Sequence, residues 1–414
     1  MRQVPQIPHY YRQIITLFIL IVVDELGFWI LLPVLAPLIN ETSSALLGGQ
    51  VSPAMQHLIL GIIMGLSPFC AILSAPLLGF MSDQIGRKKV LLICLTGTFI
   101  GFVCYAFSFW WLSLPLLLLA RIIIGVTTAS QAIVQAVMAD LSQGKQKAIN
   151  ISIVACAMTL PLVIGPLIGG LLSDNAIVPW FNRSTPFIFA AILSLLNLLM
   201  LAFCFYETKM PHPIFEIKLK KYLPTLFGFM KQPEVRHLLL IFLFMELGWS
   251  LYFQSMPLLL VQKFNFNSSQ VGFFSSYIGI WMSLGLIFLT RIFLRFFSLM
   301  RIVLVNLSLT LVALLGGFIA AQQAVLWLIV SPIAIGIGLT YTALITRLSD
   351  KVSKDTQGLL MGFTDAILYF AFACTGLLAG LLTAVSATLP LLMASIFILI
   401  SYLASVRIKH ATYK

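Results

Sequence analysis

Four acidic side chains and one arginine lie inside long apolar stretches of this 414-residue sequence. Asp24 and Glu25 lie in "VVDELGFWILLPVLAPL", Glu246 in "FMELGWSLYFQSMPL" and Asp365 in "GFTDAILYF", while Arg121 follows "LPLLLLA". Removing a carboxylate from water favours its protonated form, and an approaching cation favours the charged form. These acids predict a site where a proton and a cation compete for the same carboxylate.

The composition indicates what surrounds these groups. Hydrophobic residues make up 60% of the chain and charged residues only 9%, whereas soluble domains carry about a quarter charged residues. Many apolar runs are long enough to cross about 30 Å of hydrocarbon as a helix. Because backbone groups must be paired in lipid, these runs are expected to be helices. We predict an all-α polytopic membrane protein.

Charged or turn-rich breaks separate the apolar runs and predict twelve transmembrane helices. The first run is too long, and too acidic at its centre, to be a cleavable signal peptide, so we expect it to be retained. The helices are expected near 12–38, 56–80, 89–109, 112–138, 147–172, 185–207, 236–262, 269–290, 299–320, 323–346, 357–384 and 388–408.

The net charge of +12 is distributed unevenly along the chain. With twelve spans and a cytoplasmic N-terminus, all of the 25 Lys and Arg except Arg121, Arg183 and Lys263 fall on one side. This asymmetry follows the positive-inside rule and predicts that both termini are cytoplasmic. The basic surface is expected to face the lipid bilayer, not nucleic acid. No CxxC pair and no spaced histidine pair occurs, so we expect no metal and no cofactor.

A basic, proline-interrupted stretch at 208–235 divides the chain in two. We predict an N-terminal six-helix bundle at 1–207, a cytoplasmic linker at 208–235, and a C-terminal six-helix bundle at 236–414. The "ELGF" at 25–28 is echoed by "ELGW" at 246–249, which indicates an internal duplication. Parallel repeats of this kind build one large group of transporters.

The loop after the second span, "GFMSDQIGRKK" at 79–89, resembles the loop signature of the major facilitator superfamily. Gln84 stands where that signature has a basic residue. The resemblance implies a cytoplasmic gate. The matching residues are Gly79, Asp83, Gly86, Arg87 and Lys88.

Two further stretches resemble signatures of drug:proton antiporters in this superfamily. In "LPLVIGPLIGGLL" (160–172), the helix-packing residues Gly165, Pro166, Gly169 and Gly170 match, while Pro161 replaces a glycine. In the fourth span, "RIIIGVTTASQAIVQAVMAD" places an arginine four residues before a glycine. The resemblance implies two pseudo-symmetric bundles in the major facilitator fold and a proton-coupled exporter of a small amphipathic organic compound or drug. We expect a monomer in the bacterial inner membrane.

The helix rise predicts the depth of the intramembrane acids. Glu25 lies about 20 Å along its helix from Arg12, and Glu246 and Asp365 lie about 15 Å from the nearest basic residues before them. A charge at mid-membrane costs at least a few kcal/mol unless it is paired or hydrated. We expect the acids to line a central chamber as proton-coupling sites, with Arg121 as the charge partner of Asp24 or Glu25. For Glu246 and Asp365, a structural ion pair or hydrogen bond between helices is the alternative.

Polar and aromatic side chains near these charges are candidates for binding the cargo. Aromatic faces bind flat organic molecules and cations, although a single aromatic side chain more often packs in a core or against lipid. The candidates are Phe28, Trp29, Thr128, Gln131, Gln135, Trp249, Phe253, Gln254, Tyr277, Trp281 and Tyr369.

Other functions compete with transport of an amphipathic compound. A proton-coupled importer or exporter of a specific metabolite or siderophore is one alternative, but one arginine against four acids disfavours a polycarboxylate cargo. A membrane-embedded enzyme or a sensor is the alternative from another class. The sequence contains no phosphate-binding glycine loop and no nucleophile constellation, so we do not expect an enzyme.

Overall fold

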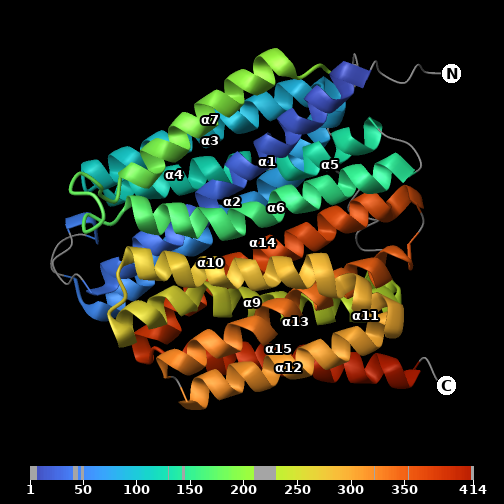
Figure 1. Cartoon of the computed structure of the whole chain (residues 1–414). Helices are drawn as coiled ribbons and strands as arrows, with labels where there is room; N and C mark the ends of the chain where they lie inside the picture. The colour runs from blue at the N-terminus through green and yellow to red at the C-terminus, as the bar shows by residue number, and fades with distance from the viewer. Residues whose placement is uncertain are drawn as a thin grey trace.

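The computed structural model of the chain describes residues 7–40, 45–47, 51–128, 130–141, 145–208, 230–320, 322–352 and 354–411. Within these ranges some side chains, including that of Asp83, are not described. Every regular element in the described part is helical (Figure 1). The predicted all-α class is therefore confirmed.

The helices agree closely with the predicted spans, and the fourth span is built from two helices. The first part of the chain forms α1 (Ile7–Leu35), α2 (Pro53–Ile85), α3 (Arg87–Trp110), α4 (Leu114–Thr127), α5 (Ser130–Asp140), α6 (Lys145–Leu172) and α7 (Thr185–Cys204). The second part forms α9 (Pro233–Phe264), α10 (Ser268–Leu284), α11 (Thr290–Phe296), α12 (Leu299–Ala320), α13 (Gln323–Ser349), α14 (Lys354–Val385) and α15 (Leu389–Ala411).

Among the described residues, eleven helical segments are long and apolar enough to cross a membrane. The predicted span at 147–172 corresponds to α6, whose described apolar part is the shorter stretch Ala157–Leu172. The predicted fourth span comprises α4 and α5, and the eighth continues from α10 through a π-helix (Gly285–Leu289) into α11. The chain is an integral membrane protein.

Short polar residues fix several helix ends. Ser52 caps α2, and Pro53 occupies its first turn, where its missing N–H leaves no helical bond unmade. Asn267 and Gln270 form a reciprocal capping box at the start of α10. Asn265 ends α9 in the left-handed conformation.

The helices form two groups, α1–α7 and α9–α15, which lie side by side (Figure 1). The start of α1 and the end of α15 lie at the same end of the molecule, here called the termini end. The predicted linker at 208–235 falls largely outside the described residues, so the domain boundaries stay a prediction.

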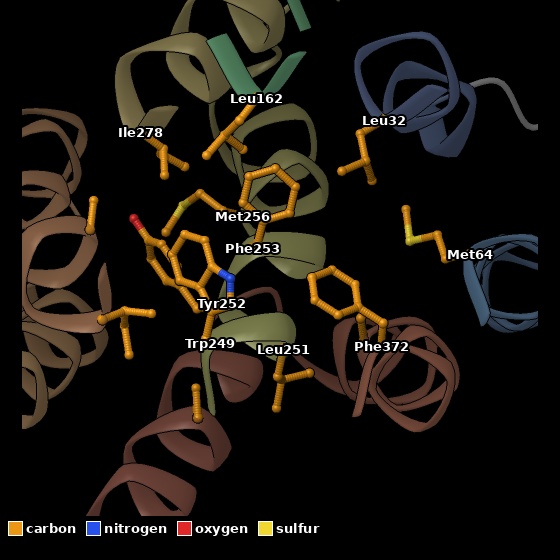
Figure 2. Packing of buried hydrophobic residues seen from close by; sticks show 14 of the residues in the cluster. Leu32, Met64, Leu162, Trp249, Leu251, Tyr252, Phe253, Met256, Ile278 and Phe372 are labelled. Carbon is orange, nitrogen blue, oxygen red and sulfur yellow. The ribbon is translucent and has the colours of Figure 1, made fainter. Parts of the chain in front are cut away.

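The two groups pack tightly at the end opposite the termini, here called the closed end. A Cβ on Gly61 of α2 would stand 2.9 Å from the carbonyl oxygen of Gly376 of α14. The hydroxyl of Ser276 in α10 donates to the carbonyl of Val163 in α6 at 2.6 Å. Figure 2 shows side chains of both groups meeting there, with Leu32 and Leu162 facing the side of Phe253.

Toward the termini end, two glycines of the same helices have open space beside them. A Cβ built on Gly79 of α2 or on Gly362 of α14 would meet no atom within 4 Å. The α2–α14 pair is therefore in close contact near the closed end, while Gly79 and Gly362 do not pack on the facing helix.

Candidate functional site

Asp24, in the middle of α1, is bonded to two hydroxyl groups of its own half. Thr98 of α3 donates to Oδ1 at 2.5 Å, and Ser130 of α5 donates to Oδ2. Thr98 and Ser130 are both buried. The Asp24 carboxylate thus joins α1, α3 and α5.

Glu25 lies within electrostatic range of an acid in the other half of the molecule. It makes no hydrogen bond or ion pair with any residue that the structure describes, and its side chain is half-buried. Asp365 of α14 lies within electrostatic range of Glu25, and Tyr369, one turn beyond Asp365, lies within range of both. Asp365 is also half-buried and without a hydrogen bond among the described residues. Each half therefore contributes one of two carboxyl groups that lie within electrostatic range of each other and are not bonded to the described part of the protein.

Glu246 extends this group into the second half. It is only 2% exposed, and its Oε2 has no hydrogen-bond partner among the described residues. Tyr341 of α13 lies within electrostatic range of both Glu246 and Asp365. A charge buried without a partner is costly, so this carboxyl group is suited to holding a proton.

The predicted charge pair between Arg121 and the first-span acids does not form between these described side chains. The guanidinium of Arg121 donates through Nε to the carbonyl of Ile63 at 2.6 Å and through Nη2 to that of Met64 at 2.5 Å. Pro68 has no N–H to donate to the carbonyl of Met64, four residues before it. Arg121 satisfies this carbonyl and is thereby held against α2, on the closed-end side of the acids.

Arg121 makes two further contacts with aromatic side chains. Its Nη1 lies 3.4 Å from the hydroxyl of Tyr105, and its guanidinium carbon lies 6.0 Å from the ring centre of Phe28. All of these interactions are with carbonyls, a hydroxyl and a ring face. No acid among the described residues compensates its positive charge in this conformation.

Several predicted cargo-binding side chains are packed together instead of lining open space. Trp249, Phe253 and Gln254 are buried, at 5%, 0% and 1% exposure. Phe253 contacts Trp29 edge-on across the interface, with ring centres 5.0 Å apart. Phe28 likewise meets Phe372 of the second half at 5.5 Å. Both halves converge at the depth of these rings, so the aromatic contacts close the space between the two halves there.

A small void remains between the halves beside Arg121. Its volume is about 10 Å³, and Gln254 contributes to its wall together with Phe28 and Met64. A site of this size holds about one water molecule. An organic cargo does not fit there in this conformation.

The other predicted cargo residues are spread over several helices. Gln131 and Gln135 lie half-buried on α5, while the hydroxyl of Thr128 donates to the carbonyl of Ile124. Tyr277 and Trp281 of α10 contact each other edge-on, with ring centres 6.0 Å apart. The structure therefore places Tyr369 near the acids and joins α5 to Asp24 through Ser130, while Tyr277 and Trp281 pack against each other on α10.

The predicted gate loop is fastened to the end of α7. Glu207 accepts hydrogen bonds from the backbone N–H groups of Arg87 at 2.9 Å and Lys88 at 3.0 Å, at the N-terminus of α3. Gly86 has φ +105°, and a Cβ there would stand 2.5 Å from Oε2 of Glu207. The side chain of Asp83, another predicted gate residue, lies outside the described part of the chain.

The predicted glycine motif of α6 lies at two close helix contacts. A Cβ on Gly165 would stand 2.6 Å from the Cβ of Trp29 in α1. Gly169 packs on the backbone of Ile30, and Gly170 on α10, where a Cβ would stand 2.5 Å from the carbonyl oxygen of Ser268. Pro166 presents its carbonyl to Gly272 of α10. The motif thus lets α6 approach helices of both halves.

Comparison with protein families shows to which family this chain belongs. The family model described as Major Facilitator Superfamily matches residues 17–376. The chain belongs to the Major Facilitator Superfamily. It is a secondary transporter and not an enzyme, and its cargo is a small molecule.

Similar members of the superfamily include tetracycline resistance proteins. The class H protein of Pasteurella multocida is 32% identical over 48% of this chain and 45% of its own length. The class C protein of Escherichia coli is 26% identical over 84% of this chain and 83% of its own length. The match to class H spans less than half of that relative.

Solved structures of superfamily members share the fold over nearly the whole chain. The human organic anion transporter MFSD10 (TETRAN) has a TM-score of 0.71 at 22% identity and covers 96% of this chain and 99% of its own. A D-xylose-proton symporter has a TM-score of 0.75 at 13% identity, covering 95% and 97%. The predicted major facilitator fold is confirmed.

Four residues that participate in this site are not among the predicted ones. Thr98 and Ser130 bind Asp24, Tyr341 lies within electrostatic range of Glu246 and Asp365, and Glu207 caps α3. For Ser130 a signal is present: the run "TTAS" at 127–130 places hydroxyl residues in mid-span, and such side chains compete with helical hydrogen bonds. The others depend on which helices are neighbours, and the tertiary fold sets that.

Proposed function

We propose that this protein is a proton-coupled antiporter that exports small amphipathic organic compounds, with Glu25 and Asp365 as its coupling carboxyl groups. The observation that carries the proposal is the position of these two acids: they come from opposite halves, lie in electrostatic range of each other, and have no hydrogen bond to the described residues. Groups so placed are available to a proton or to a cationic cargo.

The uneven packing along α2 and α14 supports alternating access. Gly61 is tightly packed at the closed end, whereas Gly79 and Gly362 have open space at the termini end. Rocking of two bundles about a midplane site would exchange these contacts. In the conformation described here, the acids are then reached from the termini end, which is the cytoplasmic end in the predicted topology.

The balance of charge favours cargo with a positive group. Four acids lie near the interface: Asp24, Glu25, Glu246 and Asp365. The hydrogen bonds that Arg121 donates go to two carbonyl groups and one hydroxyl group. A cation approaching Glu25 and Asp365 favours their charged forms and displaces their protons. Cargo loading is thereby tied to proton release.

The relatives suggest which compound to test first. Their names record resistance to tetracycline, and tetracycline is small and amphipathic. We therefore propose tetracycline as the first cargo to examine, followed by hydrophobic organic cations such as ethidium.

Everted membrane vesicles test the proposal. Vesicles acidified by respiration and monitored with a quenched amine dye should lose protons when tetracycline or ethidium is added, and vesicles without the protein should not. Accumulation of the compound together with protons would instead indicate symport. The absence of a proton response to every compound of a broad amphipathic panel would contradict the proposal.

A further inference from the structure

The fourth span is interrupted in its middle, between α4 and α5. α4 ends at Thr127, α5 begins at Ser130, and the backbone of Thr128 has φ −77° and ψ 83°, outside the helical region. The hydroxyls of Thr127 and Thr128 donate to the carbonyls of Ile123 and Ile124 at 2.9 Å and 2.7 Å. These bonds hold both side chains against the last turn of α4.

The other side of the interruption is the N-terminus of α5, and Asp24 is bound there. Ser130, the first residue of α5, donates to Oδ2 of Asp24, while Thr98 of α3 donates to Oδ1 at 2.5 Å. The carboxylate of Asp24 therefore has two hydrogen-bond partners on other helices, whereas the neighbouring Glu25 has no hydrogen-bond partner among the described residues.

Close packing fixes one side of the interruption. A Cβ on Gly97 would stand 2.7 Å from the hydroxyl oxygen of Thr127, so α3 lies directly against the end of α4. The adjoining α5 begins at the residue that binds Asp24, and it carries Gln131 and Gln135, both half-buried. The bond at the first residue of α5 therefore connects this helix to α1, in addition to its packing against α6 and α3.

We propose that Asp24 is a positioning residue that holds the interrupted fourth span in shape by joining α1, α3 and α5, and that it does not carry the coupling proton. The two adjacent acids of α1 then have different roles: Asp24 sets the direction of α5 and of its two glutamines, and Glu25 exchanges protons. This inference rests on the proposed function only for the second role.

The geometry of α5 provides the first test. Spin labels are placed on the exposed residues Ala132 of α5 and Leu199 of α7, with the native cysteines replaced by serine. Asp24→Asn, Ser130→Ala and Thr98→Val should each shift or broaden the distance distribution, because each removes at least one of the two bonds. Ser130→Thr, which keeps the hydroxyl, and Glu25→Gln should leave the distribution as in the unmodified protein.

Transport of tetracycline in proteoliposomes provides the second test. Ser130→Ala and Thr98→Val should reduce the rate by about tenfold, as loss of a hydrogen bond to a charged group predicts, and should retain the unmodified dependence on pH. An unchanged distance distribution in Asp24→Asn, or in both hydroxyl variants if Asp24→Asn does not fold, would overturn the inference. The distances do not depend on the cargo, so a shift without tetracycline transport would contradict the proposed function alone.

Discussion

Gly61 of α2 packs directly on the backbone of Gly376 of α14, where a Cβ on Gly61 would stand 2.9 Å from the carbonyl oxygen of Gly376. This contact joins the two halves of the transporter at the closed end. Near the other end of the same helices, a Cβ on Gly79 or on Gly362 would meet no atom within 4 Å. Small residues therefore lie toward both ends of one pair of helices, and only those at the closed end pack on the facing helix.

Replacing Gly61 by valine should open the closed end. The added side chain overpacks the contact with α14, which costs about 1–3 kcal/mol and shifts a two-state population accordingly. Spin labels at the exposed residues Trp111 and Leu328 measure the opening across the closed end. We expect a longer distance in Gly61→Val than in the unmodified protein; an unchanged distance would show that this contact does not hold the halves together.

Replacing Gly79 by valine should have the opposite effect. The side chain is tolerated in the conformation described here because the space is open, but it should prevent closure of α2 on α14 at the termini end. Labels at the exposed residues Lys89 and Phe296 should then keep a single long distance when cargo and pH are varied, and transport should be lost. Full transport activity in this variant would contradict alternating contact at Gly79.

The bond between Arg121 and Met64 predicts a coupling with Pro68. Arg121→Gln leaves the carbonyl of Met64 without its donor, which should lower the free energy of unfolding by about 1–3 kcal/mol. Pro68→Ala restores a backbone N–H for that carbonyl, so the loss should be smaller when both changes are combined. Thermal unfolding in detergent measures all four proteins. Strictly additive effects would show that Arg121 does not compensate for the proline.

Gly86 and Gly79, two residues of the predicted gate motif, provide a matched pair of alanine substitutions. Gly86 has φ +105°, and its Cβ would meet Glu207, so Gly86→Ala should cost about 1–3 kcal/mol of stability. Gly79→Ala adds a methyl group in open space within a helix and should be neutral or stabilising by up to about 1 kcal/mol. The melting temperature of Gly86→Ala should therefore lie clearly below that of Gly79→Ala. Equal melting temperatures would contradict the role of the Gly86 turn.

The sequence is sufficient to predict the helices because hydrophobic length is the dominant constraint in lipid. The expected span at 299–320 corresponds to α12 (Leu299–Ala320), and that at 388–408 to α15 (Leu389–Ala411). Hydropathy predicts the fourth span as one helix. Its interruption at Thr128, where the backbone leaves the helical region, is not registered by an average of hydropathy.

The partners of the intramembrane charges are harder to predict. The sequence favours a pair between Arg121 and an acid, but Arg121 binds α2 because Pro68 frees a carbonyl on that helix, and only the tertiary fold brings α2 and α4 together. The burial of Trp249 and Phe253 likewise depends on the conformation, since these rings close one end of the molecule here. Residue types thus indicate the chemistry, while the contacts require the structure.

The most direct test of the account compares Glu25→Gln with the unmodified protein in proteoliposomes under an imposed pH gradient. The amide keeps the shape of the side chain but does not exchange a proton. With tetracycline or ethidium as cargo, the unmodified protein should move the compound uphill and release protons. Glu25→Gln should lose uphill transport and cargo-driven proton release, and it should bind a cationic cargo more weakly because one of the two carboxylates is removed. Uphill transport by Glu25→Gln, with the pH dependence of the unmodified protein, would contradict the central claim that Glu25 couples protons to cargo.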